Sequence, residues 1–548
     1  MKQFTEIHHF FTYLNHVVPT CWDQPAITDY QGKYDYTYGK AAEQVAKIRL
    51  LLNKAGIQAG DHVAICSNNC ANWAVAAMSI TINHSVIVSL MDAFVPEDIE
   101  KLVRHSNAKA MFVSSAVWEH IHIESLPNVD LVLNTESFQL LYARTPQIEE
   151  VYQNIEQLFI EQYPNGFGKE NINLPEDRLD DLMIINYTSG TTSSPKGVML
   201  SYRNISANIQ YSQETIPNKA GWTEICMLPL AHMFGFSIEF LYQVCGGCHV
   251  YFLNKKPSPT ILMQAYSEVK PYMILTVPLV LEKIFRKKIF PALQKPIVKV
   301  IWNTPLLCKV IEKRIYKELM NAFGGQLIWL ITGGAAVHPE VERIFRRIRF
   351  PFVVGYGLTE TGPLACYAHW YNEVQGCCGT VVDRCELKID SEDPYKIVGE
   401  IFFRGPHVMM GYYNNEEATK EILDADGWLH TGDLGVVDKQ GRLFIKGRKK
   451  AMILSSNGQN IYPEEVEEKV NSLPMVEESL VVDRNGKLVA LVVPEHHIER
   501  DVIEEQMKKN LVLLNEQLPK HSQIQSIEIM ETEFEKTPKQ SIKRFLYS

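Results

Sequence analysis

The sequence predicts an α/β protein: a large N-terminal domain of two doubly wound α/β subdomains plus a small β-barrel, followed by a small α+β C-terminal domain. Three observations support this prediction. Strand and helix patterns alternate in two long stretches, short strands with polar turns follow them, and a compact segment ends the chain. A chain of 548 residues also exceeds what one hydrophobic core usually supports.

The first alternation occupies the N-terminal part of the chain. Its helical and strand patterns follow one another as in βαβ units with parallel strands. The last strand runs directly into a loop rich in Ser, Thr and Gly, and parallel sheets bind ligands beyond the carboxyl ends of their strands. We expect helices over 38–55 and 73–82 and strands over 62–66, 85–90 and 183–187.

A second alternation runs from about Trp222 to Tyr367, and a different pattern follows it. Short strands with polar turns over 376–444 indicate a β-barrel or a β-rich subdomain. The last hundred residues predict one helix and a strand pair joined by Asn485-Gly486, which is hairpin turn chemistry. The expected domains are therefore 1–446 and 447–548. The predicted elements are strands over 271–277, 326–332, 399–404, 479–483 and 488–494 and helices over 305–323, 339–347 and 463–473.

Composition limits the class of protein. A hydrophobic content of 46% and a charged content of 22% are typical of a folded soluble protein, and a net charge of −10 argues against nucleic acid as the main partner. The eleven cysteines have no framework spacing, and Cys245-Gly-Gly-Cys248 lacks the second pair that a zinc site needs. We expect reduced thiols and a cytoplasmic location. The start of the chain is unlike a signal peptide, and no apolar run is long enough to cross a membrane, although peripheral membrane contact stays compatible with the sequence.

The segment from Thr188 to Gly197 has the chemistry of a polyphosphate site. Its glycines let backbone N–H groups approach a ligand, its hydroxyls donate hydrogen bonds, and Lys196 adds positive charge. It is not a Walker loop, because Pro195 stands where that motif has glycine before the lysine. The candidate phosphate-binding residues are Thr188, Ser189, Gly190, Thr191, Thr192 and Lys196.

This segment resembles the signature loop of the acyl-adenylate-forming superfamily, except that Ser193 stands where the usual pattern has glycine. Further motifs follow in that family's order and extend the resemblance over nearly the whole chain. It is most similar to long-chain fatty acid–CoA ligases, notably at Lys449-Lys450 and over 405–413. The motifs are Leu228–Gly235, Thr332–Ala335, Gly355–Thr361, Gly427–Asp433 and Gly447–Lys450.

The resemblance implies a residue set for ATP and Mg²⁺. Glu360 and Thr191 match the metal ligands, and carboxylate and hydroxyl oxygens suit Mg²⁺. Tyr356 matches the aromatic residue that stacks on adenine, and Asp433 matches the acceptor of the ribose hydroxyls. By the same resemblance Thr359 donates to the α-phosphate. The remaining implied nucleotide-site residues are Gly333, Gly334, Ala335, Gly355, Gly357, Arg448, which reaches ribose or phosphate, and Lys450, which lies at the family's interdomain hinge.

The resemblance also implies a substrate pocket. His232 and Phe234, together with Gly334, match residues that line the carboxylate and thiol pocket, and His232 is a candidate catalytic residue. A single histidine in an apolar stretch is more often a core residue, but its place before Met-Phe-Gly favours the pocket. The segment 455–458 lies, by the family pattern, near the channel for the pantetheine arm of CoA.

The chain departs from the family near its C-terminus. The usual pattern ends in Lys-Thr-x-x-Gly-Lys, whereas Gln540 and Ser541 stand at its glycine and catalytic lysine. A neutral serine cannot stabilise the charge that grows on the α-phosphate. If the segment is extended, Lys539 and Lys543 point the same way as Ser541, and of the two candidate replacements we favour Lys543.

The leading hypothesis is an ATP- and Mg²⁺-dependent acid–thiol ligase. It converts a medium- to long-chain fatty acid to acyl-AMP and pyrophosphate, and then transfers the acyl group to CoA with release of AMP. A first alternative loads the acyl group onto an acyl carrier protein. A second alternative, which Ser541 keeps open, is a nucleotide-binding protein without catalysis.

Overall fold

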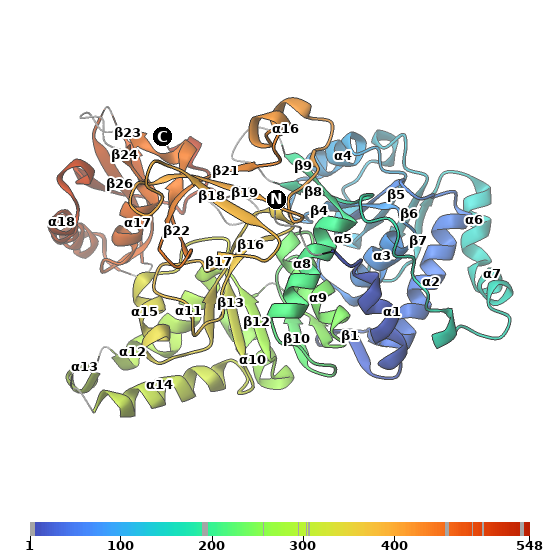
Figure 1. The fold of residues 1–548 in the computed structure, drawn as a ribbon, viewed down its shortest axis with the longest axis horizontal. Helices are drawn as coiled ribbons and strands as arrows, with labels where there is room; N and C mark the ends of the chain where they lie inside the picture. Colours follow the sequence, from blue (N-terminus) through green and yellow to red (C-terminus); the bar gives the residue numbers. More distant parts are fainter. Residues whose placement is uncertain are drawn as a thin grey trace.

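The computed structural model describes most of the chain, and the gaps include the centre of the Ser/Thr/Gly loop. The described residues are 6–188, 195–255, 257–293, 295–302, 304, 307–454, 460–484, 486–495, 498–536 and 542–547. Figure 1 shows two large α/β halves side by side, a β-rich part above their junction, and the C-terminal segment at one end of the molecule.

The first subdomain is built on an eight-stranded sheet in the order β20-β9-β8-β4-β3-β5-β6-β7. Its five central strands, β8 to β6 in that order, run parallel, which confirms the predicted βαβ pattern. β3 alternates between two cores, with Val63 and Ile65 on one face and Ala64 and Cys66 on the other. The strands are β3 (His62–Cys66), β4 (Val86–Leu90), β5 (Ala110–Val113), β6 (Leu131–Asn134), β7 (Leu140–Ala143), β8 (Leu182–Thr188), β9 (Lys196–Ser201) and β20 (Gly411–Tyr412).

The second subdomain has a seven-stranded sheet in the order β14-β13-β12-β10-β11-β1-β2. Six of these strands are parallel, and β2 is antiparallel to β1. The sheet takes two strands from the start of the chain, which the sequence did not assign to it. The strands are β1 (Pro25–Asp29), β2 (Asp35–Thr37), β10 (Thr223–Cys226), β11 (His249–Phe252), β12 (Met273–Thr276), β13 (Trp329–Thr332) and β14 (Phe352–Val354).

Two helices lie between the sheets. Every residue of α3 (Ala71–Ile82) is buried, and α3 contacts β3 and β4 of the first sheet and β1 of the second. The N-terminal two-thirds of α8 (Tyr202–Thr215) is almost entirely buried as well. The outer faces carry α1 (Phe11–Thr20), α2 (Tyr38–Lys54), α4 (Pro96–His105), α5 (Ser115–Trp118), α6 (Pro146–Gln153), α7 (Ile155–Gln162), α10 (Pro259–Val269), α11 (Pro278–Lys288), α12 (Phe290–Leu293), α13 (Pro296–Trp302), α14 (Cys308–Ala322) and α15 (Pro339–Arg347). Every residue of the short helix α9 (Tyr242–Cys245) is buried.

The β-rich part consists of two small antiparallel sheets. One has the order β15-β16-β17 and the other β18-β19-β21-β22. Two backbone hydrogen bonds join the two sheets along one edge: the Cys378 N–H donates to the Leu443 carbonyl, and the Leu443 N–H donates to the Gly379 carbonyl. The strands are β15 (Tyr356–Gly357), β16 (Leu364–Tyr367), β17 (Thr380–Val381), β18 (Glu386–Asp390), β19 (Gly399–Arg404), β21 (Leu429–Val437) and β22 (Leu443–Arg448), and α16 (Glu416–Ile422) precedes β21.

The C-terminal segment has its own core, in which α17 (Pro463–Asn471) and α18 (Arg500–Gln517) pack on a three-stranded sheet. β26 (Leu488–Pro494) is antiparallel to β25 (Val476–Asp483) and parallel to β27 (Ser526–Ile529). The predicted hairpin turn at Asn485-Gly486 is described only at Gly486, whose φ is +77°; Asn485 lies outside the described residues. The expected boundary at 446/447 falls within β22. In the part of the chain that the structure describes, no helix combines the length and apolarity needed to cross a bilayer.

Candidate nucleotide and acyl site

The Ser/Thr/Gly loop connects the antiparallel strands β8 and β9. Thr188 and Lys196 are paired at the end of the two strands from which the loop extends, so the two residues are 8 positions apart in sequence and adjacent in space. Asn186 of β8 donates to the Ala231 carbonyl at 2.6 Å and ties the hairpin to the His232 loop. Ser189, Gly190, Thr191 and Thr192 lie outside the described residues, so their roles stay predictions.

A carboxylate, a phenol and an ammonium group meet beside this hairpin. The Tyr412 hydroxyl donates to Glu360 Oε1 at 2.8 Å, and the Lys196 ammonium lies 4.9 Å from the centre of the Tyr412 ring. Burial and the Glu360 carboxylate raise the pKa of Tyr412, so this phenol stays a neutral donor. The cluster forms because β20 joins the edge of the first sheet and places Tyr412 beside β9.

A second cluster lies where β15 approaches β21. The Tyr356 hydroxyl donates to Asp433 Oδ2 at 2.8 Å, and the Arg448 Nε lies 3.3 Å from Asp433 Oδ1. Asp433 and Arg448 are cross-strand neighbours on β21 and β22. Burial raises the pKa of Asp433 and Arg448 opposes that shift, while the Glu360 charge raises it further.

Glycine is structurally required at two positions near Tyr356. A Cβ on Gly357 would lie 1.9 Å from the Pro363 carbonyl oxygen, because the chain turns back there from β15 into β16. Gly334 has φ +84°, a conformation that side chains disfavour. A Cβ on Gly333 would lie 3.1 Å from the Gly355 carbonyl oxygen, so these two motifs are in direct contact. Ala335 is exposed beside Gly334.

The His232 loop reaches the same region. A Cβ on Gly333 would lie 4.0 Å from the Phe234 ring, so the predicted substrate-pocket loop adjoins the predicted adenine loop. His232 and Phe234 are both half-buried. The chain then enters η3 (Gly235–Leu241), a π-helix, and π-helices are often found at functional sites. Thr359 is half-buried in η4 (Thr359–Thr361), next to Glu360.

Of the two predicted C-terminal lysines, only Lys543 lies in the described part of the chain. An isolated antiparallel bridge joins Lys536 to Ile542, and beside it the Lys543 ammonium lies 3.4 Å from Glu535. The next residue, Arg544, contacts Glu467 and lies 3.7 Å from Glu464, an acid whose charge contributes to the raised pKa of Asp433. Lys539 and Ser541 lie outside the described residues, so the choice between Lys539 and Lys543 stays a prediction.

Lys450 is exposed in η5 (Lys449–Ala451), which directly follows β22. It therefore lies in the connection to the C-terminal segment, as a hinge residue would. The predicted pantetheine-channel segment 455–458 lies outside the described residues. Ion pairs across this connection join Lys446 to Glu465 at 3.0 Å and Arg286 to Glu495 at 3.2 Å.

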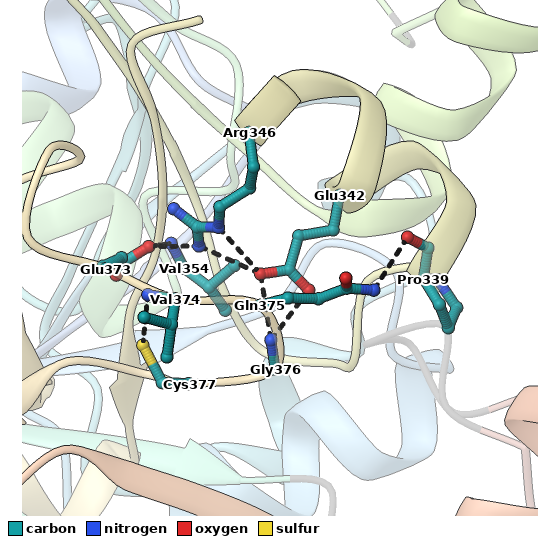
Figure 2. Close-up of polar contacts among 9 residues, drawn as sticks. All are labelled: Pro339, Glu342, Arg346, Val354, Glu373, Val374, Gln375, Gly376 and Cys377. Atoms are coloured by element: carbon teal, nitrogen blue, oxygen red, sulfur yellow. Dashed lines mark hydrogen bonds and ion pairs between the residues drawn. The ribbon is translucent and has the colours of Figure 1, made fainter. Parts of the chain in front are cut away.

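A buried ion network contacts the backbone that leads into Gly355 and Tyr356. Arg346 of α15 donates to Glu342 Oε1 at 2.9 and 3.1 Å and to Glu373 Oε2 at 2.5 Å (Figure 2). Glu373 also accepts the Val354 N–H at 3.3 Å, one residue before Gly355. Burial raises the pKa of Glu373 to about 8, against the opposing influence of Arg346. We call Glu342, Arg346 and Glu373 the Arg346 network.

Sequence reasoning missed Tyr412 and the Arg346 network. Tyr412 stands in the segment 405–413, which the sequence singled out only for its general likeness to the family. The Arg346 network had a weaker signal: Glu342 and Arg346 are four residues apart on one helix, but Glu373 comes from a loop. Cys245 and Cys248 are buried free thiols whose pKa values burial raises, as expected for apolar packing. Within the described ranges, no group of three or more His, Cys, Asp or Glu side chains could hold a metal ion.

The chain belongs to the family of AMP-binding enzymes. The family model for the AMP-binding enzyme matches residues 15–413, and the model for the AMP-binding enzyme C-terminal domain matches residues 450–547. The resemblance inferred from the motifs and the fold class is thereby confirmed.

Individual relatives and solved structures agree with this assignment. Long chain acyl-CoA synthetase 7, peroxisomal, from Arabidopsis thaliana is 28% identical over 499 residues, covering 86% of this chain and 70% of the relative. The long-chain-fatty-acid–acyl-carrier-protein ligase AEE15, chloroplastic, from the same plant is 26% identical over 554 residues, covering 87% and 74%. ATP-bound MatB from Rhodopseudomonas palustris has the same fold, with a TM-score of 0.78 at 21% identity over 98% of this chain and 97% of that one.

Proposed function

We propose that this enzyme activates a medium- to long-chain fatty acid with ATP and Mg²⁺ and transfers the acyl group to CoA. In the first half-reaction a carboxylate oxygen bonds to the α-phosphorus of ATP and pyrophosphate leaves. In the second, the thiol sulfur bonds to the acyl carbon and AMP leaves. The observation that carries the proposal is the meeting of the motifs 228–235, 332–335, 355–361 and 427–433 around Glu360, Tyr356 and Asp433 in a chain of this family.

The residues of the site suit this chemistry because two anions must approach each other. Glu360 can hold Mg²⁺: its Oε1 accepts from Tyr412, and a half-buried carboxylate is a ligand type that Mg²⁺ prefers. Bound Mg²⁺ would offset negative charge on the phosphates. Lys196 adds a cation on the same side. We assign the ribose hydroxyls to Asp433, whose carboxylate can accept both, and the Arg448 Nε 3.3 Å away supports the orientation of that carboxylate.

Space for an acyl chain adjoins the helical segment η3–α9, which follows the His232 loop. An apolar cavity of about 110 Å³ lies between α1, α2 and α3 and is bounded by Phe240 and Val244, which follow Phe234 along η3 and α9. Its wall consists almost entirely of apolar side chains, including Val75 and Met78 of α3. This supports an apolar tail on the acid, and we assign the distal part of the chain to this cavity.

The direct test is pyrophosphate release from ATP with a panel of carboxylic acids from acetate to stearate. We expect release with the longer saturated acids and, with CoA present, stoichiometric AMP and acyl-CoA. Glu360→Gln should lower release at least 100-fold, the scale of losing one preorganised electrostatic contact. Glu417→Gln, which changes an exposed acid on α16, is the matched control. Undiminished turnover in Glu360→Gln would refute the proposed role.

Ser541 stands where the family has its catalytic lysine. A separate experiment tests which neighbouring lysine performs that role. We expect Lys543→Ala to lower acyl-AMP formation far more than thioester formation from supplied acyl-AMP. Lys539→Ala is the competing variant, and Lys536→Ala, which removes a lysine already paired with Glu478 at 2.9 Å, is the control. Equal loss of both half-reactions in Lys543→Ala would contradict its assignment.

Two alternatives remain distinguishable. A carrier-protein ligase would use the same residues, and one relative bears that name, so CoA and a holo acyl carrier protein should be compared side by side as acceptors. A nucleotide-binding protein without catalysis would bind ATP yet release no pyrophosphate with any acid. The cytoplasmic location and peripheral membrane contact stay parts of the proposal.

A further inference from the structure

The segment that forms α11 to α14 has a charge opposite to that of the chain as a whole. Between Glu282 and Glu318 the sequence contains ten lysines and arginines but only three glutamates, in a protein with a formal net charge of −10. Of these helices, α12, α13 and α14 lie at the lower left of Figure 1. The described cations of α14, Lys309, Lys313, Arg314 and Lys317, are exposed on this edge.

The outward face of α14 combines cations with apolar side chains. Lys309, Lys313 and Lys317 are spaced four residues apart and are exposed, so they form one stripe along the helix. Among the described residues the structure gives none of the three an ion-pair partner. Val310 on the same helix is 69% exposed and Leu307 just before it is 54% exposed. The opposite face is buried through Ile315 and Leu319.

Two further side chains extend this surface. Val300 of α13 is 68% exposed, and Arg314 is exposed beside Lys313, with Glu318 at 2.9 Å as its partner. We name the surface formed by Val300, Leu307, Val310 and the three lysines the basic ridge.

We propose that the basic ridge docks the enzyme on the surface of an anionic lipid bilayer. Lysines attract anionic headgroups, and the aliphatic side chains between them can enter the headgroup boundary, as on interfacial amphipathic helices. This inference rests on the proposed function, because long-chain acids partition into membranes and an enzyme bound to the bilayer can take them up from it.

The composition of the ridge favours lipid over two other anionic partners. Nucleic acids are contacted through arginine, lysine and polar side chains, with aromatic groups that stack on bases, whereas the apolar members of the ridge are all aliphatic. An acidic carrier protein must place its thiol arm in the catalytic site, whereas the ridge lies on the outer edge of α14, apart from β21 in Figure 1. Both partners remain outcomes of the test.

The test measures co-sedimentation of the full chain with vesicles of phosphatidylcholine alone or mixed equally with phosphatidylglycerol. We expect binding only to the anionic vesicles, and weaker binding as salt is raised. Replacing Lys309, Lys313 and Lys317 by Gln should lower the partition coefficient roughly 100-fold, from about fivefold per lysine. Val310→Ser should weaken binding at high salt as well as at low salt.

The matched control neutralises three exposed lysines of the first subdomain, Lys40, Lys54 and Lys101, and should bind as the wild type does. Pyrophosphate release with octanoate, a water-soluble acid, should be unchanged in all these variants. Equal binding to both vesicle types, equal loss in the control variant, or binding to RNA or to a holo carrier protein in place of vesicles would overturn the proposal. Absence of pyrophosphate release with every acid would refute the proposed function while leaving the vesicle result intact.

Discussion

Arg346→Met tests whether the Arg346 network stabilises the domain and the backbone at Gly355 and Tyr356. Arg346 is only 16% exposed, and its partners Glu342 and Glu373 are 5% and 0% exposed at the side chain. Removing the guanidinium leaves the two buried carboxyl groups without a positive partner. Breaking a buried ion pair in this way lowers the free energy of unfolding by about 3–5 kcal/mol. For domains of 150–250 residues this corresponds to a fall in Tm of roughly 6–20 °C.

The stability that Arg346→Met loses should depend on pH, and the direction of this dependence follows from the titration of Glu373. Burial raises the pKa of this carboxyl to about 8, above its value in the unfolded chain. The stability that its proton contributes is therefore fully present below about pH 4.5 and is lost as the pH rises to about 8. Without Arg346 that pKa rises further, so the deficit of the variant should be small at pH 5 and largest near pH 9.

The assay is thermal unfolding by tryptophan fluorescence at both pH values, together with KM for ATP. KM should rise, because Glu373 also accepts the Val354 N–H immediately before Gly355. Arg343→Met on the same helix is the control: Arg343 is 64% exposed and 3.9 Å from Glu340, and an exposed pair contributes at most about 1 kcal/mol. Adding Glu373→Gln to Arg346→Met should restore part of the loss. Equal Tm values for the two arginine variants would refute the reasoning.

The remaining predictions concern three other sites. Tyr412→Phe removes the hydrogen bond to Glu360, and we expect the Mg²⁺ concentration for half-maximal pyrophosphate release to rise roughly 10- to 100-fold; an unchanged value would contradict a supporting role for Tyr412. Glu224 is fully buried beside Glu239, its oxygens have no hydrogen-bond partner in the described chain, and burial raises its pKa well above normal. Glu224→Gln should therefore increase the free energy of unfolding, by up to about 1.4 kcal/mol per pH unit above 4.5, so that Tm rises more at pH 8 than at pH 5; a pH-independent change would argue against it. Val244→Phe should shift acid preference toward shorter chains, as the panel of acids would show; a rise in Tm with unchanged preference would mean that the cavity does not receive the acyl chain.

The sequence alone determined the class of fold and most of the elements that carry the motifs. The buried strands 62–66 and 85–90 and the helix 339–347 were found from periodicity, because a strand buried on both faces and an amphipathic helix each leave a local pattern. The motif residues Tyr356 and Asp433 were chosen by resemblance, and the structure brings these two together at 2.8 Å.

Only the tertiary structure decided which distant segments share a sheet. β1 and β2 join the second subdomain, and the two-residue strand β20 leaves the β-rich part of the sequence to pair with β9. Tyr412 therefore lies beside Lys196 and Glu360, although more than two hundred residues separate it from Lys196. Strand pairing depends on backbone hydrogen bonds that carry no side-chain signature, so local sequence could not reveal this neighbour.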